Sequence, residues 1–568
     1  MSRVRFWLLG VMHGFLSQAL GTAGKRVYAS IFLVAILYLV FHLTIGFGLV
    51  LATTRSAPFV ALAVSVTLIT ALAGTLQISE ALVFSAISVW RGPRRFVAPP
   101  PTITDEDLPL VIVQIPGRNE PLIEVRRSID SVLASSYPAA RLLVQHIDNS
   151  DDARWQAIVN SYRGEPRVSV LHRDGTSGFK AGNLNIGLRA IESGRYGDPT
   201  QVLVGLLDVG DTFAEQVLRF LATEFVHDPG LGFVQALTRV RNPDDTLITK
   251  AESYITNAWW RYGQAMQGHY GMPAIYGHHV LVRLKSLLDI GGWEETKISE
   301  DWATGNKLLL AKWRGKWVDY ATNDPRVVSG EMAPPTLEGQ QKQKGKWATG
   351  GSELAKTFLP WVKAPLPWNY RLDLLIRLTS FPTAALRFLG MLTIPLWVGF
   401  AAAHGENRPA LHFGLLSASL QSAWLIHRLA CSGNYLREGD IRSAIGMLVC
   451  IPIQAMYTMP VVPHLIHGVY KGLRYTLNTF VISPKRNDRH RGTMQIIANQ
   501  RLALGMAALL GVPAIAALST DLPGYVRLAA VSCLASAGMT TMGVFLVPIT
   551  QWLRNRLDQT RHDNDDVT

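Results

Sequence analysis

Two aspartates, Asp148 and Asp208, directly follow short apolar runs in this sequence, and the acidic pair Glu300 and Asp301 follows a glycine-rich turn. A single aspartate after a strand most often caps a helix. Several carboxylates at one sheet edge are costly, however, unless a cation or a hydrogen-bonding ligand compensates their charge. Because Mg²⁺ takes one or two carboxylates together with phosphate oxygens, the pattern favours a site for a nucleotide diphosphate and Mg²⁺.

The elements that position these carboxylates alternate between strand-like and helix-like patterns. Strands are predicted at residues 110–115, 142–147, 168–171 and 202–207, and helices at 122–133, 180–191 and 213–226. Such alternation predicts an α/β domain with a mostly parallel sheet and helices on both faces. Ligands bind beyond the carboxyl ends of such strands, so we expect Asp148 and Asp208 to converge on one crevice.

The composition indicates that this domain is attached to a membrane. Of 568 residues, 48% are hydrophobic and 17% charged, and the formal net charge is +13. Residues 27–54 and 56–79 contain no Asp, Glu, Lys or Arg, and each is long enough to cross a bilayer. Three cysteines exclude a disulfide framework, and no basic stripe with interleaved aromatic residues indicates nucleic acid. Disordered, collagen-like and purely soluble classes are therefore excluded.

Further apolar stretches follow the predicted domain, at residues 380–403, 409–427, 443–470, 502–520 and 528–553. We expect six spans and do not count 443–470 among them, because Pro452, Pro460 and Pro463 would break a lipid-exposed helix there; a seventh or eighth span is the alternative. The first 25 residues have helical apolar spacing with basic residues, which favours an interfacial amphipathic helix over a cleaved signal peptide. Basic flanks place the α/β domain in the cytoplasm, beside a membrane that the chain crosses several times; the family resemblance described below implies that this is a bacterial inner membrane.

The predicted organisation has five parts. They are an amphipathic N-terminus with two spans (1–90), a cytosolic catalytic domain (91–350), interfacial helices (351–378), a C-terminal transmembrane region (379–553) with a loop at 478–492, and a cytosolic tail (554–568).

Ordered motifs within the domain carry a family resemblance. Residues 113–121 read VQIPGRNEP, residues 178–185 read GFKAGNLN, and Ser299-Glu300-Asp301 precedes QKGKW at 343–347. This series resembles the membrane-integrated processive glycosyltransferases of family 2, which include cellulose, curdlan, chitin and hyaluronan synthases. The resemblance implies a GT-A-like domain inserted between transmembrane bundles.

The resemblance also implies roles for individual residues. Asp301, beside Glu300, would be the general base that takes a proton from the acceptor hydroxyl. The residues implied to bind the nucleotide sugar are Asn119, Glu120, Asp148, Asp151, Lys180 and Asp208. Those implied to meet the acceptor or the leaving diphosphate are Gln343, Lys346, Trp347 and His278. A gating loop over the donor would include Phe480, Ser483 and Lys485.

Two positions depart from the family pattern. The metal motif, usually Asp-x-Asp, reads Asp208-Val209-Gly210-Asp211, so glycine stands where the second carboxylate is expected. Three alternatives remain open: Asp211 supplies the ligand, Asp208 suffices with phosphates and water, or metal binding is weakened or lost. Lys346 replaces an arginine, and lysine cannot make the planar bidentate contact of a guanidinium.

From these observations we expect an inverting, processive β-glycosyltransferase that uses Mg²⁺ or Mn²⁺. It would transfer sugar from a nucleotide donor to a growing β-glucan and thread the polymer across the lipid bilayer. The acidic turn after residue 147 resembles a uracil-binding turn, so we expect the donor to be UDP-glucose. Periplasmic export subunits would be partners. One alternative is a single-transfer enzyme acting on a polyprenyl or other lipid phosphate. The other is an inactive scaffold or export pore, suggested by Gly210 and Lys346.

Overall fold

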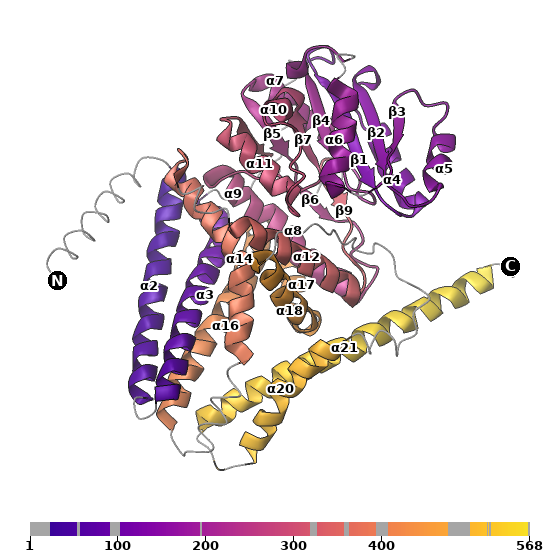
Figure 1. The fold of residues 1–568 in the computed structure, drawn as a ribbon. Helices are drawn as coiled ribbons and strands as arrows, with labels where there is room; N and C mark the ends of the chain where they lie inside the picture. Colours follow the sequence, from indigo (N-terminus) through magenta and orange to yellow (C-terminus); the bar gives the residue numbers. More distant parts are fainter. Residues whose placement is uncertain are drawn as a thin grey trace.

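The computed structural model describes residues 23–53, 57–90, 103–175, 177–192, 196–318, 326–356, 363–392, 407–474, 500–519, 521 and 524–565. A block containing the strands lies at one end of the molecule, and long helices extend from it (Figure 1). The first 22 residues, including the expected amphipathic helix, lie outside the described residues.

A seven-stranded sheet forms the centre of the block, in the order β3-β2-β1-β4-β7-β5-β8. Its strands are β1 (Leu110–Gly117), β2 (Leu142–Asp148), β3 (Val168–His172), β4 (Val202–Leu206), β5 (Leu231–Gln235), β7 (Val280–Arg283) and β8 (Arg314–Trp317). Strand β7 runs antiparallel to β4 and β5, and the other pairs are parallel. The expected mostly parallel sheet is confirmed. A small parallel pair, β6 (Thr238–Val240) and β9 (Ser329–Glu331), lies apart from it.

Helices cover both faces of this sheet, as expected. Those on one face are α4 (Leu122–Leu133) and α7 (Val217–His227), and those on the other are α6 (Phe179–Glu192), α10 (Leu284–Asp289) and α11 (Glu300–Leu310). In α4 the residues Val125, Ile129 and Val132 are buried at a spacing of one helical turn. Helix α5 (Arg154–Ser161) packs beside α4 and β3 at the edge.

Long apolar helices make up the rest of the described chain. They are α2 (Ala23–Ala52), α3 (Ala57–Trp90), α14 (Trp368–Leu392), α16 (Asn407–Arg437), α17 (Ile441–Val449), α18 (Ile451–Arg474), α20 (Arg501–Leu518) and α21 (Gly524–Asp565). Four of the described helices are long and apolar enough to cross a membrane, or five if α17 and α18 form one span. Helices α14 and α16 occupy two further predicted stretches and carry buried arginines, Arg387 and Arg428.

The predicted break in residues 443–470 is at the junction of α17 and α18, which are bent by 52°. The bend lies at Cys450, just before Pro452, whereas Pro460 and Pro463 are within the continuous helix α18. A proline early in α18 is tolerated because the first helical N–H groups have no partner in any case.

The α/β block and the long helices share packed contacts. Helix α8 (Leu247–Ala258), the π-helical turn η3 (Trp259–Gln264) and α9 (Ala265–Tyr270) lie between them (Figure 1). Tyr28 and Phe84 from α2 and α3 belong to the same apolar core as Met266 of α9. Helix α12 (Leu337–Ala355) lies against α18 and α14. The elements that carry the predicted site are therefore fixed to the helical bundle.

Candidate active site

Lys180 joins two predicted acidic positions. It is the second residue of α6, which begins at Phe179 with a positive φ of 51°. Its Nζ lies 2.6 Å from Asp208 Oδ1 and 3.6 Å from Glu300 Oε1, and it donates a 2.6 Å hydrogen bond to the carbonyl of Gly277. Burial alone would lower the pKa of Lys180, but the charges of Asp208 and Glu300 raise it. The ammonium group therefore stays protonated between two carboxylates.

Glu300 and Asp301 begin α11 beside this lysine. Burial raises the pKa of Glu300 to about 7, against the opposing charge of Lys180, and burial also raises the pKa of Asp301. Asp301 Oδ1 accepts a 2.8 Å hydrogen bond from the backbone N–H of Trp302. A raised pKa favours a carboxylate that accepts a proton. The role of Asp301 as the general base remains a prediction.

The turn after β4 directs its two aspartates to different partners. Gly210 has φ of 90°, its N–H donates to Ser128 Oγ at 2.9 Å, and its carbonyl accepts from Arg241 Nε at 2.6 Å. Asp208 faces Lys180, whereas Asp211 is buried and accepts the Met332 N–H at 2.9 Å. The positive φ of Gly210 therefore turns the backbone so that the side chains of Asp208 and Asp211 reach different partners.

Asp211 lies next to a histidine pair. His278 Nδ1 is 3.8 Å from Asp211 Oδ2 and 2.6 Å from His279 Nδ1, and His278 Nε2 is 3.2 Å from Glu331 Oε2. Burial alone would lower the pKa of His278, but its hydrogen bond to Glu331 and the nearby carboxylates raise it to about 9. Burial and the charge of His278 lower the pKa of His279.

The same three side chains could hold a metal ion. Asp211, His278 and His279 each offer one ligand atom, and these atoms lie within 4.8 Å of one another. Two imidazoles beside one carboxylate fit a transition-metal ion better than Mg²⁺, which takes oxygen ligands. Asp208, expected as a ligand together with Asp211, is outside this group and is paired with Lys180. His278 and His279 were expected to help present the acceptor hydroxyl and not to bind metal; His279 immediately precedes β7.

Helix α12 brings the predicted acceptor residues to the same region. The charge of Lys346 acts on Glu300, which places the predicted diphosphate lysine beside the acidic cluster. Trp347 is 43% exposed, and Lys344 Nζ lies 4.5 Å from the centre of its ring. Lys344 is also 2.6 Å from Glu252, so it is engaged away from the diphosphate position. Gln343 is half-buried on the same helix.

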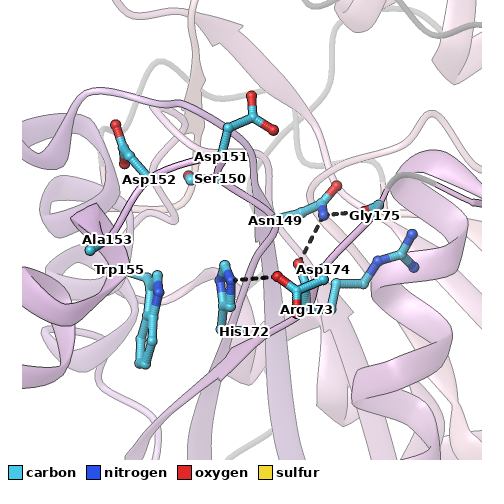
Figure 2. Close-up of a pocket in the computed structure, with 10 residues that line it drawn as sticks. All are labelled: Asn149, Ser150, Asp151, Asp152, Ala153, Trp155, His172, Arg173, Asp174 and Gly175. Carbon is cyan, nitrogen blue, oxygen red and sulfur yellow. Dashed lines mark hydrogen bonds and ion pairs between the residues drawn. The ribbon is translucent and has the colours of Figure 1, made fainter.

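A separate pocket lies at the ends of β2 and β3, with a volume of about 400 Å³ (Figure 2). The rings of Trp155 and His172 stack there, with centroids 4.9 Å apart and planes 13° apart. Buried Asp148 lies beneath the pocket and accepts hydrogen bonds from Ser150 Oγ at 2.8 Å and His172 Nδ1 at 3.0 Å. An aromatic stack beside acidic groups can bind a nucleobase through its face and its N–H donors.

Other predicted donor-binding residues border this pocket. Asn119, with φ of 53°, donates a 2.6 Å hydrogen bond to Asp151 and accepts the Asp151 N–H at 3.0 Å. Glu120 is half-buried and its carbonyl accepts from Arg154. Asp148 and Asp208 lie on strands separated only by β1, which is about 10 Å at ordinary strand spacing. Trp155 and His172 were not predicted, although His172 ends a parallel strand just as Asp148 does.

The predicted gating residues Phe480, Ser483 and Lys485 lie in 475–499, outside the described residues. The described site therefore consists of the Lys180 cluster, the histidine pair, the exposed face of α12 and the pocket at β2 and β3.

Two overlapping segments of this chain match known protein families. Residues 112–291 match the family described as "Glycosyl transferase family 2", and residues 203–435 match "Glycosyl transferase family group 2". Together these segments contain Lys180, Asp208, Asp301 and Trp347.

Two curated relatives are each 26% identical to this chain. One is a beta-monoglucosyldiacylglycerol synthase from Synechocystis, matched over 50% of this chain and 58% of the relative. The other is a probable glucomannan 4-beta-mannosyltransferase 6 from Oryza sativa, matched over 47% and 46%. The chain thus spans about half the length of these relatives.

Among solved structures, a mannosyltransferase from Pyrobaculum calidifontis in complex with GDP-Man and Mn²⁺ aligns with 69% of this chain and 97% of its own. The TM-score is 0.44 and the sequence identity 21%.

Proposed function

This chain carries a glycosyltransferase family 2 domain, and from that premise we propose that it is an inverting hexosyltransferase that uses a nucleotide-sugar donor. The family 2 domains and the glycosyltransferase relatives support a hexosyltransferase. The observation that carries the proposal is the contact of Lys180 with both Asp208 and Glu300, directly beside Asp301.

The residues of the site would have separate roles in binding the donor, activating the acceptor and stabilising the leaving group. The stacked Trp155 and His172 would hold the nucleobase, and Lys180 and Lys346 would lie along the diphosphate. Asp301 would take the proton from the acceptor hydroxyl as that oxygen attacks the anomeric carbon. The new carbon–oxygen bond forms as the bond to the diphosphate breaks, and the configuration inverts. The negative charge that develops on the diphosphate would be stabilised by the two lysines.

A divalent cation would add charge neutralisation at the diphosphate when bound. Asp211, His278 and His279 would hold it, and their donor set favours Mn²⁺ over Mg²⁺.

The finer proposal is processive synthesis of a β-glucan from UDP-glucose, with export through a bacterial inner membrane. Two features support it. The exposed ring of Trp347 offers a stacking surface for a sugar, and its helix α12 lies directly on the membrane helix α18. The acidic turn at Asp148–Asp151 favours a uracil base because carboxylates accept its ring N–H.

The second candidate is a single transfer to a lipid acceptor. It is favoured by the relative that is a glucosyldiacylglycerol synthase, and by the position of the catalytic cluster beside a helical bundle. The length of the product separates the two candidates, since one gives a chain of sugars and the other one sugar on a lipid.

The test uses the purified chain in detergent with Mn²⁺ or Mg²⁺ and radiolabelled UDP-glucose, UDP-GlcNAc or GDP-mannose, with and without added lipid. We expect release of nucleoside diphosphate and a labelled product from one donor. Asp301→Asn should lower turnover by at least about 10²-fold, because the general base is lost. Asp289→Asn, at an exposed carboxylate on α10, is the matched control. Wild-type turnover in Asp301→Asn would remove Asp301 as the base.

A further inference from the structure

Two arginines are buried inside the helical bundle, away from the catalytic cluster. Arg387 on α14 is 7% exposed and Arg428 on α16 is 8% exposed. They lie close enough for their charges to interact, and among the described residues Glu80 of α3 is the carboxylate whose charge reaches both. Helices α3, α14 and α16 contact one another (Figure 1). We call Glu80, Arg387, His427 and Arg428 the arginine site.

The arginine site has donors without acceptors. The Nε atoms of Arg387 and Arg428 are buried and have no hydrogen-bond partner among the described residues. Arg428 Nη1 lies 3.1 Å from His427 Nδ1, and an arginine can only donate. His427 Nδ1 is therefore the acceptor, so a neutral ring carries its proton on Nε2, which is also buried and unpartnered in this part of the chain.

Neighbouring carboxylates do not satisfy these donors. Within the described residues, Glu80 acts on both arginines through its charge alone and makes no hydrogen bond to either. The charge of Glu252 also reaches Arg428, but Glu252 is bound by Lys344 at 2.6 Å and by the Tyr457 hydroxyl. Two guanidinium groups thus face one distant carboxylate. Each also lies over an aromatic ring, Arg387 at 4.3 Å from the centre of Phe388 and Arg428 at 5.0 Å from that of Trp424. Buried charges without an ion-pair partner cost several kcal/mol, and within membrane bundles they mark binding sites.

The site lies at the end of the bundle that faces the catalytic block. Glu80 is one helical turn from Phe84, whose carbonyl accepts a 2.8 Å hydrogen bond from Asn434 Nδ2. A Cβ at Gly263 of the π-helical turn would lie 2.6 Å from the Phe84 ring. Basic sites between membrane helices on the cytoplasmic side bind lipid headgroups.

We propose that the arginine site binds the phosphate of a membrane lipid headgroup between α3, α14 and α16. The guanidinium groups would each donate to phosphate oxygens, which is the geometry in which arginine binds phosphate most strongly. The Nε2–H of His427 would donate as well, and one negative charge would balance the excess positive charge. This site is independent of the sugar donor and of product length, so it extends beyond the proposed function.

The experiment measures lipid binding to the full chain in non-ionic detergent, by native mass spectrometry and by the apparent midpoint of thermal unfolding. The probes are dioleoylphosphatidylglycerol, dioleoylglycerol, which lacks the phosphate, and inorganic phosphate. We expect binding and stabilisation that depend on Arg387 and Arg428 with the phospholipid alone, because dioleoylglycerol bound as an acceptor at the catalytic cluster would not need these arginines. R387Q and R428Q should each weaken binding about tenfold, as expected for loss of a charged hydrogen bond. R442Q, at an exposed arginine on α17, is the matched control and should bind like wild type.

Two outcomes would overturn the proposal. Dioleoylglycerol binding that R387Q and R428Q weaken as much as phospholipid binding would show that the phosphate is not recognised. Equal stabilisation by inorganic phosphate would show that no lipid is needed. If the glutamine variants fail to fold, R387K and E80Q decide the matter. R387K keeps a charge but loses the fork of donors, so binding should weaken, whereas E80Q removes the competing carboxylate, so binding should be retained or strengthened. Unchanged binding in R387K together with lost binding in E80Q contradicts the site. Lipid binding is read without turnover, so its failure is distinguishable from failure of the proposed function.

Discussion

Lys180 determines the electrostatics of the acidic cluster. Its ammonium group lies between Asp208 and Glu300 and also acts on the charge of Asp301. A cation in this position allows three carboxylates to share a buried edge of the sheet. Its attachment to the Gly277 carbonyl fixes the lysine to the loop before β7.

The pH dependence of turnover should follow from this cluster. Asp301 accepts a proton only when it is ionised, and burial raises its pKa, so kcat/KM should begin to fall at a higher pH than it would with an ordinary aspartate as the base. Glu300→Gln removes a neighbouring negative charge and should lower the pKa of Asp301, which moves the acidic limb to lower pH. The measurement is kcat/KM between about pH 5 and 9. Glu215→Gln, at an exposed carboxylate, is the control; an unshifted limb in Glu300→Gln would contradict the coupling.

At the residue level, the sequence indicates the acidic positions but not their partners. Asp208, Glu300 and Asp301 were predicted from strand ends and motif order, and the structure places them around one lysine. The separation of Asp208 from Asp211 could not be predicted, because it depends on the positive φ of Gly210 and on contacts of its backbone with Ser128 and Arg241. The link from His278 to Glu331 joins segments that are distant in sequence.

Among the secondary-structure elements, the loop before β7 shows why a glycine precedes the histidine pair. Gly277 has φ of 79°, and a Cβ there would lie 2.8 Å from Asp301 Oδ2. Gly291 has nearly the same φ, 81°, but a Cβ there would meet nothing within 4 Å. Substituting each glycine in turn therefore distinguishes the effect of backbone strain from the effect of a contact with Asp301.

We expect Gly277→Ala and Gly291→Ala to lower stability by a similar amount, about 1–2 kcal/mol, since both place an alanine at positive φ. Only Gly277→Ala should also lower kcat, by about tenfold or more, because its methyl group displaces the Asp301 carboxylate. Thermal unfolding and turnover of the two variants provide the comparison. An equal loss of kcat in both variants would mean that strain, not contact, is responsible.

The elements of the sheet were largely predictable. Strands β1 to β4 appear within one or two residues of their predicted ends, because short apolar runs bounded by turn residues are a strong strand signal. The antiparallel insertion of β7 between β4 and β5 was not predictable from local pattern, because direction in a sheet depends on long-range pairing. Helices α14 and α16 were predicted as apolar spans, and the pattern gave no indication that their arginines are buried.

Across the whole molecule, one buried ion pair connects the catalytic block with two membrane-side helices. Asp373 of α14 accepts hydrogen bonds from Tyr28 of α2 at 2.7 Å and from the N–H of Met272 at 2.8 Å, and it pairs with Arg377 at 2.8 Å. Asp373 itself is fully buried. The packing of α2, α14 and the segment at Met272 against one another therefore depends on the carboxylate of Asp373.

Asp373→Ala should lower the free energy of unfolding by about 3–5 kcal/mol, because it leaves Arg377 buried and unpaired. The double variant D373A/R377M should recover part of this loss, since neither charge then remains. Thermal unfolding in detergent and limited proteolysis between the block and the bundle measure the effect. Glu338→Ala breaks a more exposed pair with Lys342 and should change stability by less than about 1 kcal/mol. A loss in Asp373→Ala no larger than this control would contradict the assignment.

The close approach of α12 to α18 has a mechanical consequence. A Cβ at Gly468 would lie 3.1 Å from Ala348 Cβ, and one at Gly472 would lie 2.9 Å from Ser352 Cβ, so no side chains separate the two backbones. Without intervening side chains to rearrange, neither helix can slide or roll against the other by a fraction of a turn. Trp347 is thus held at a fixed position relative to α18, and a sugar that stacks on its ring would meet a rigid surface.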